Sequence, residues 1–228
     1  MAEPRDLWVF AYGSLMWRPG FASEEIVHAR LVGWRRSFCI YSRYHRGSPR
    51  RPGLVLGLDR GGTCEGMAFR VAASRAAETL RYLREREQVV SVYREALVPV
   101  TLLNAERPEV MALAFLVERA HPSYAGVLSL AEQAHFIRGG AGRSGNNIDY
   151  LASTLEHLAQ LGIRERGIER LLTLVGAHVA RRADGGHARA SALALARVFG
   201  RHPARARRLK AEDARRFGYR AALNTRKD

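Results

Sequence analysis

Long apolar runs and a cysteine framework are both missing from this 228-residue sequence. No stretch approaches the roughly 18 apolar residues that a membrane span needs. The N-terminus also lacks the basic start and the apolar segment of a secretory signal. Cysteine occurs only at Cys39 and Cys64, which is too few for a disulfide framework and favours a reducing compartment. The sequence therefore predicts a cytoplasmic protein without a membrane partner.

Metal-binding patterns are absent as well. The histidines at positions 121, 135, 157 and 178 show no HxxxH or HExxH spacing, and such spacing places two ligands on one helical face. Neither cysteine has a second cysteine at CxxC spacing. We therefore expect no metal site.

Lysine is scarce, at Lys210 and Lys227 alone, although the formal net charge is +15. Residues 179–228 contain twelve Arg and two Lys against four acidic residues, so +10 of that charge lies there. Such a segment is typical of polyanion binding, but a solvated tail has the same composition. Residues 188–199 also permit a helix packed on the domain. The sequence thus predicts one domain at 1–178 and a basic, helical extension at 179–228, for which a nucleic-acid partner stays open.

The order of apolar patterns predicts an α+β chain, and 47% hydrophobic residues are enough for a sizeable core. Strands are expected at 7–11, 29–41, 54–58, 64–71, 96–103 and 110–117. The Gly-rich residues 59–63 are expected to form a hairpin turn. Helices are expected from a cap at Ser74 to about Gln88, from a capping box of Ser129 and Glu132 to Gly139, from Asn146 or Asn147 to Gly162, and over 168–175.

The turn after the first strand is one candidate site. Residues 7–11 are apolar without polar alternation, so both faces of this strand are expected to be buried. Gly13 permits a sharp bend and a close approach of a ligand to the backbone. Consecutive N–H groups at Gly13, Ser14 and Leu15 would form a concavity for an anion or a developing oxyanion. An ordinary turn after a buried strand has the same pattern, so both interpretations stay open.

Glu87 is the other candidate. At 100° per residue its side chain projects within about 40° of Leu80 and Leu83, whereas Glu78 and Glu85 fall on the far side of the helix. A carboxylate on the apolar side is costly unless it is paired or used, and desolvation raises its pKa. An ion pair with a neighbouring arginine, or a helix that ends early, explains Glu87 as well as a functional role does.

Four motifs in a fixed order are similar to one known family. They are residues 12–17 (Tyr-Gly-Ser-Leu-Met-Trp), Arg46 and Gly47 with residues 51–58, Arg86 and Glu87 followed by Tyr93, and residues 144–147 before Tyr150 and Leu151. This series resembles the ChaC family of glutathione-specific γ-glutamylcyclotransferases over about residues 6–175. The resemblance implies a small mixed β-barrel or sheet flanked by helices, and the basic extension lies outside it.

The resemblance also implies the chemistry. Glutathione would be the substrate and would be cleaved to 5-oxoproline and Cys-Gly, without water, metal or organic cofactor. Glu87 would be the catalytic base, and Tyr12, Gly13, Ser14 and Leu15 would hold the γ-glutamyl group. Tyr124 matches a tyrosine in a later loop of the family and would contact the substrate.

Two further functions stay open at this point. The same site would accept other γ-glutamyl amines or dipeptides if its specificity were broad. Alternatively, the chain would be a non-enzymatic binding protein that uses the basic residues 179–228. The sequence favours the glutathione-specific enzyme, because four ordered motifs are more specific than a charged segment.

Overall fold

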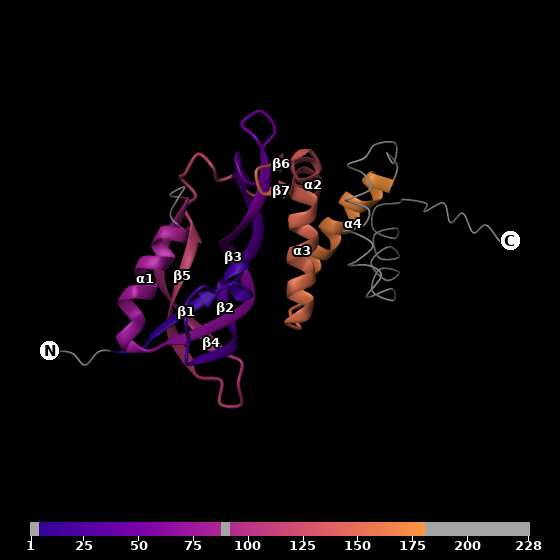
Figure 1. Cartoon of the computed structure of the whole chain (residues 1–228). Helices are drawn as coiled ribbons and strands as arrows, with labels where there is room; N and C mark the ends of the chain where they lie inside the picture. Colours follow the sequence, from indigo (N-terminus) through magenta and orange to yellow (C-terminus); the bar gives the residue numbers. More distant parts are fainter. Residues whose placement is uncertain (1–4, 88–91, 181–228) are drawn as a thin grey trace.

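A closed five-stranded barrel forms the centre of the structure (Figure 1). The computed structural model describes residues 5–87 and 92–180. The barrel strands are β1 (Leu7–Ala11), β2 (Glu25–Ser42), β3 (Gly53–Val71), β4 (Tyr93–Leu102) and β5 (Glu109–Val117). They are hydrogen-bonded in the order β1-β3-β2-β4-β5, and parallel pairing of β1 with β5 closes the barrel. The closing contacts are short, with two residue pairs between β1 and β5 and two between β2 and β4.

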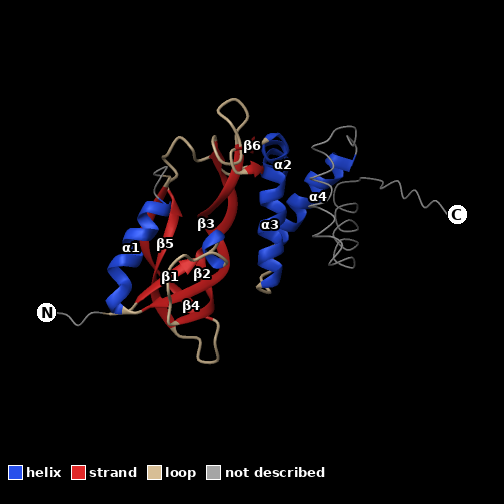
Figure 2. Ribbon diagram, viewed as in Figure 1, coloured by secondary structure: helices blue, strands red, loops and turns tan. Residues whose placement is uncertain are grey.

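Helices flank the barrel on two sides (Figure 2). One side carries α1 (Ala73–Glu87), and the other carries α2 (Leu130–Gly139) and α3 (Asn147–Gln160), with α4 (Arg166–Ala180) packed outside these two. The short elements are the 3-10 turn η1 (Ser14–Met16) and the strands β6 (Ala141–Gly142) and β7 (Gly145–Asn146). The predicted α+β class is confirmed. The expected basic extension lies outside the described residues from position 181 onward, and no described helix is long and apolar enough to span a membrane.

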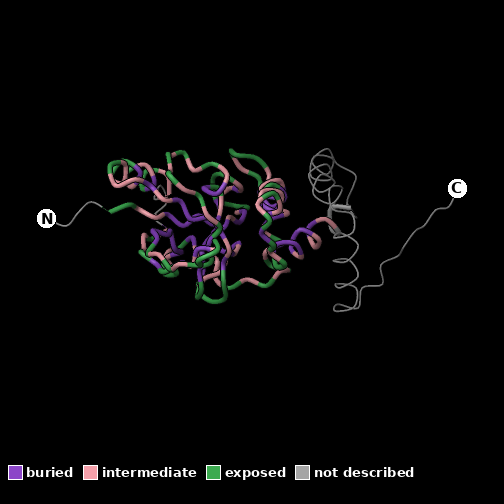
Figure 3. Tube along the Cα trace, turned by 90° about the horizontal axis from the view of Figure 1, so that it is seen from below, coloured by how far each residue is buried: buried purple, intermediate pink, exposed green. Residues whose placement is uncertain are grey.

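One apolar core runs from the barrel into the helical layer (Figure 3). Its fully buried side chains include Phe10, Phe38, Phe69 and Phe115 in the barrel and Leu151, Leu158 and Leu172 in the helices. Burying a side chain of this size stabilises the fold by about 1.5–3 kcal/mol. Because the same cluster contains both sets, the helices α3 and α4 are fixed relative to the strands.

The prediction of a hairpin turn at 59–63 is wrong. Instead, β3 continues through these residues and stays paired with β2. Gly61 has φ 95° and Gly33 on the facing strand has φ 85°, conformations that only glycine adopts at low cost. The register between the strands shifts between Val32 and Trp34, as at a β-bulge. The glycines therefore bend a paired ribbon and do not end a strand.

The N-terminal cap of α2 agrees with the cap that the sequence predicts, whereas that of α3 differs. The capping box before α2 is confirmed, since Ser129 accepts from the Glu132 N–H at 3.3 Å and Glu132 accepts from the Ser129 N–H at 2.7 Å. At α3, the side chain of the N-cap residue Asn146 makes no capping bond. The buried amide of Asn147 binds the N–H of Leu54 at 2.6 Å and its carbonyl at 2.7 Å. Asn147 thus ties α3 to β3 and is not a cap.

Candidate active site

Residues 12–15 form the loop that follows β1. The Gly13 carbonyl accepts a hydrogen bond from the Met16 N–H at 2.9 Å, which closes the turn η1. Tyr12 and Leu15 are buried, while Ser14 is exposed. The first N–H groups of such a turn have no partner inside it, and no backbone bond among the described loops uses the N–H of Ser14 or Leu15. Among the residues that the structure describes, these two N–H groups therefore have no backbone partner.

Glu87 is the last residue of α1, and its side chain is 18% exposed. By contrast, Glu78 and Glu85 are exposed, so the inward position of Glu87 that the helical period predicts is confirmed. The helix begins at Ala73, one residue before the expected cap, and the Ala73 N–H donates to the Asp6 carboxylate at 3.0 Å. Burial raises the pKa of Glu87, and the adjacent arginine cation opposes this rise only in part.

Arg86 joins the two candidate segments. Its Nη2 donates to the Ser14 hydroxyl at 3.0 Å, and its Nε lies 3.3 Å from Glu87 Oε1. Its Nη1 also donates to the Arg18 carbonyl at 2.6 Å. The rigid guanidinium fork can hold several acceptors at once, so the loop after β1 and the end of α1 lie side by side although 72 residues separate Ser14 from Arg86.

Three tyrosines share this environment. Burial raises the pKa of Tyr12, Tyr93 and Tyr150, and the charge of Glu87 contributes to each rise. Their phenols therefore stay protonated at neutral pH and can act as donors. The Tyr93 hydroxyl donates to the Leu56 carbonyl at 2.8 Å. Since Tyr150 comes from α3, the helical layer also contributes to the site.

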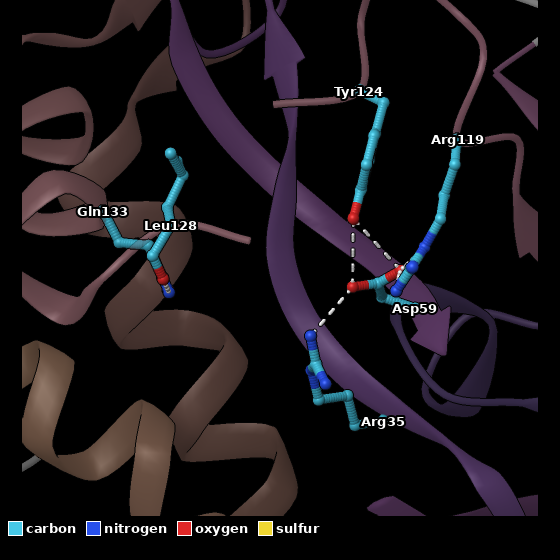
Figure 4. Close-up of polar contacts among 6 residues, drawn as sticks. All are labelled: Arg35, Asp59, Arg119, Tyr124, Leu128 and Gln133. Carbon is cyan, nitrogen blue, oxygen red and sulfur yellow. Dashed lines mark hydrogen bonds and ion pairs between the residues drawn. The ribbon is translucent and has the colours of Figure 1, made fainter. Parts of the chain in front are cut away.

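Tyr124 belongs to a different set of polar contacts (Figure 4). Its hydroxyl lies 3.3 and 3.4 Å from the two carboxylate oxygens of Asp59, which is 1% exposed. Arg119 at 2.8 Å and Arg35 at 3.0 Å pair with the same carboxylate. Tyr124 and Tyr93 pack against one small apolar group, made of Cys39, Ile40, Val92 and Val117. The structure thus brings Tyr124 near Tyr93, with its hydroxyl on Asp59 and not on Glu87.

Comparison with known proteins identifies the family of this chain. A family model described as ChaC-like protein matches residues 7–178. The chain belongs to the ChaC-like family. A curated relative in Escherichia coli, named glutathione-specific gamma-glutamylcyclotransferase, is 32% identical over 169 residues, which cover 74% of this chain and 72% of the relative. A relative in Danio rerio, named glutathione-specific gamma-glutamylcyclotransferase 1, is 34% identical over 160 residues, or 69% of this chain and 82% of the relative.

The fold of this ChaC-like protein also has a solved counterpart. A crystal structure described as a gamma-glutamyl cyclotransferase specific to glutathione from yeast superposes with a TM-score of 0.67. It is 23% identical and covers 76% of this chain and 99% of the yeast chain. The similarity concerns the fold and confirms the mixed barrel flanked by helices that the four sequence motifs implied.

The two cysteines of the ChaC-like protein are unsuited to nucleophilic catalysis. Burial, with the nearby Asp59 charge, raises the pKa of Cys39 to about 12, and burial raises the pKa of Cys64 to about 11. Neither is a thiolate at neutral pH, and the thiolate is the nucleophile. The described residues also contain no group of three His, Cys, Asp or Glu side chains arranged to hold a metal ion.

The sequence predicts no role for two residues of this site, Arg86 and Tyr150. Both occur in the quoted motifs, but no local pattern distinguishes them from a surface arginine and a core tyrosine. Arg86 belongs to the site through its hydrogen bond to Ser14, and Tyr150 through the charge of Glu87, which raises its pKa. The sequence carries a local signal for Glu87, because a helical period shows which side chains face inward, and for the turn at Gly13, because glycine permits a sharp bend.

Proposed function

We propose that this ChaC-like protein is a glutathione-specific γ-glutamylcyclotransferase, which converts glutathione to 5-oxoproline and Cys-Gly. The curated relatives that carry this name align over more than two thirds of both chains and support the proposal. In the structure, the observation that carries it is the mostly buried Glu87, which Arg86 joins to Ser14 of the 12–15 loop.

The reaction needs no second substrate. The α-amine of the γ-glutamyl group attacks its own γ-carbonyl, a new C–N bond closes a five-membered ring, and the γ-amide C–N bond breaks. Nucleophile and electrophile are already tethered, so the protein mainly has to hold the chain in a near-attack geometry and move protons. The attacking nitrogen starts as an ammonium and loses two protons, one before the attack and one as the ring closes. The nitrogen of the departing Cys-Gly changes from an amide N–H to an ammonium and gains two, so the reaction balances.

Glu87 is the group proposed to transfer these protons. A free α-amine with a pKa near 7.7–8 is mostly protonated at neutral pH, so a base must accept its proton before it attacks. Burial raises the pKa of Glu87, which brings its proton affinity closer to that of the amine. A carboxyl group tuned in this way can first accept the proton and then donate it.

The 12–15 loop is proposed to bind the γ-glutamyl group. The N–H groups of Ser14 and Leu15 are free to donate to carboxylate or carbonyl oxygens of the substrate. The Ser14 hydroxyl accepts from Arg86, so its own proton remains available as a further donor. Tyr12 contributes a buried protonated phenol, and Tyr124 is proposed to contact the substrate from the loop after β5.

The test is incubation of the purified protein with glutathione and, separately, with γ-glutamyl-alanine, followed by mass-spectrometric detection of 5-oxoproline. We expect 5-oxoproline from glutathione alone. Comparable formation from both substrates would favour a broader γ-glutamyl enzyme. If a folded sample formed 5-oxoproline from neither, the proposal would be wrong, and salt-sensitive binding of a polyanion by residues 179–228 would be the next measurement.

A further inference from the structure

A fully buried arginine lies behind the 12–15 loop. Arg36 of β2 has a side chain that is 0% exposed. Its Nε donates to the Tyr12 carbonyl at 2.5 Å, its Nη2 donates to the Glu65 carbonyl at 2.6 Å, and its Nη1 pairs with the Glu165 carboxylate. A buried charge is costly unless it is paired and hydrogen-bonded. Arg36 meets both conditions, and one of its acceptors is in the loop.

The bond to Tyr12 fixes more than one carbonyl group. The Tyr12 carbonyl and the Gly13 N–H belong to one planar peptide, and the described chain contains no cis peptide. In a trans peptide these two groups point in opposite directions. Because Arg36 holds the carbonyl on one side, the Gly13 N–H must point to the other side. Arg36 Nη2 also contacts Met16 Sδ at 3.9 Å, so the same side chain contacts both ends of the turn.

The counter-ion of Arg36 comes from the helical layer. Glu165 lies between α3 and α4, and its side chain is 22% exposed. Its backbone carbonyl accepts from the Glu169 N–H at 2.9 Å, in the first turn of α4. The position of Glu165 is thus fixed by α4, which packs on the shared core through Leu171 and Leu172. A continuous set of contacts runs from α4 through Glu165 and Arg36 to the Tyr12 peptide.

We propose that Arg36, with Glu165 as its counter-ion, is a positioning residue for substrate binding. It orients the peptide between Tyr12 and Gly13, so that the Gly13 N–H at the start of the 12–15 loop points away from Arg36 and toward the γ-glutamyl group. The inference rests on the proposed function for the identity of the substrate. The order of the loop itself is independent of that function and can be measured separately.

If the Arg36–Glu165 ion pair only stabilised the fold, replacing both residues would leave kcat/KM of the folded protein unchanged. Replacing a buried pair by hydrophobic residues of similar size is often neutral or stabilising, because no unpaired charge remains. The double variant Arg36→Met with Glu165→Met therefore keeps the packing and removes the donor to Tyr12. We expect kcat/KM for glutathione to fall about 100-fold in the folded double variant, since a misplacement of about 1 Å can cost this factor.

The matched control makes the same two substitutions at an exposed ion pair. Glu24 and Arg75 pair on the surface, with side chains that are each 43% exposed. Exposed pairs contribute about 0–1 kcal/mol, so the double variant Glu24→Met with Arg75→Met should keep kcat/KM within about 2-fold of the wild type.

Hydrogen exchange of the loop gives a readout that does not depend on activity. In the Arg36 and Glu165 double variant, amides in a peptide covering residues 12–17 should exchange about tenfold faster, because local opening needs fewer contacts to break. If that variant fails to fold, Glu165→Gln serves instead. It keeps an acceptor for Arg36 and removes only the charge, so it should show the same two changes at smaller size.

The outcomes separate the positioning role from the proposed function. A folded variant with unchanged loop exchange and kcat/KM within about 2-fold of the wild type would overturn the positioning role. Faster loop exchange together with lower kcat/KM supports it. If the wild type does not convert glutathione while the loop still exchanges faster in the variant, the proposed function fails and the orientation of the loop by Arg36 stands.

Discussion

Arg86 donates a hydrogen bond from Nη2 to the Ser14 hydroxyl at 3.0 Å. The same guanidinium lies 3.3 Å from the carboxylate of Glu87. One cation thus contacts an exposed hydroxyl of the 12–15 loop and a mostly buried carboxylate of α1. It supports the loop, and it lowers a pKa that burial raises.

Replacing Arg86 by Gln should therefore change both the rate and its pH dependence. Without the cation, burial acts unopposed and the pKa of Glu87 rises further. Because the base acts in its ionised form, the acid limb of the profile of kcat/KM against pH should move to higher pH. Loss of a charged hydrogen bond of about 1.5–3 kcal/mol to the loop should also lower kcat/KM about ten- to hundredfold above that limb.

The control for this prediction is Arg84→Gln. Arg84 lies two residues earlier on α1, is 54% exposed, and pairs with Glu95 on the surface. Its pH profile should match the wild type. A profile of Arg86→Gln that stayed in place, or moved to lower pH, would contradict the electrostatic role of Arg86.

The stability of the protein should show the same raised pKa of Glu87. A carboxyl group with a raised pKa binds its proton more tightly in the folded protein than in the unfolded chain. Its contribution to stability is present below the ordinary glutamate pKa of 4.5 and is lost as pH rises through the raised value. The glutamine side chain of the variant Glu87→Gln cannot ionise. The free energy of unfolding of the variant, relative to that of the wild type, should therefore increase as pH rises above 4.5. Urea denaturation at several pH values measures this difference, and a constant difference would count against the burial of charge at Glu87.

The sequence predicts those parts of this fold that depend on local patterns. The inward side of α1 follows from the helical period, and the capping box of Ser129 and Glu132 is a contact between near neighbours. The prediction of a turn at 59–63 fails because a bulge in a paired ribbon and a hairpin turn both favour glycine. Only the long-range pairing of β2 with β3 decides between them.

The site residues also fall into two groups: those that a local pattern predicts and those that only long-range contacts place. Periodicity predicts the inward position of Glu87 on α1, and the glycine-containing turn after the first strand predicts a candidate site at residues 13–15. The motifs add the role of the 12–15 loop toward the γ-glutamyl group. Arg36 and Arg86 act on that loop through contacts across 24 and 72 residues of sequence. In a chain with 37 Lys and Arg residues, no local pattern distinguishes these two from solvated arginines. Their partners are set by barrel closure and by helix packing.

Asn147 offers a stability test of the contact between α3 and β3. Its amide satisfies both the N–H and the carbonyl of Leu54, and the residue is fully buried. Asn147→Ala leaves two buried backbone groups without partners, so it should reduce the free energy of unfolding by roughly 2–4 kcal/mol. The neighbouring Asn146→Ala removes a side chain that makes no capping bond and should cost less than about 0.5 kcal/mol. Equal costs in denaturant titrations would mean that the amide bridge has no stabilising role.

Asp59 and its two partners, Arg35 and Arg119, form a buried carboxylate with two half-exposed cations. Removing the carboxylate should cost less stability than removing both cations. Asp59→Asn leaves Arg35 and Arg119 unpaired, but these side chains are 38% and 42% exposed and can be hydrated. We expect this variant to lose about 1–2 kcal/mol. The double variant Arg35→Gln with Arg119→Gln leaves a buried carboxylate without a cation and should lose about 3–5 kcal/mol. The two values come from urea denaturation at neutral pH, and the opposite order would contradict the burial of Asp59 as the dominant cost.

The most direct test of the account is the rate of 5-oxoproline formation from glutathione by Glu87→Gln beside Glu85→Gln. The first variant keeps the shape of the side chain and removes the base, so its rate should fall about 10²- to 10⁴-fold while the protein stays folded. Glu85 is exposed on the other side of α1, and its variant should react like the wild type. Loss of activity in Glu87→Gln alone is the predicted result. A folded Glu87→Gln protein that is as active as Glu85→Gln would contradict the assignment of Glu87 as the catalytic base.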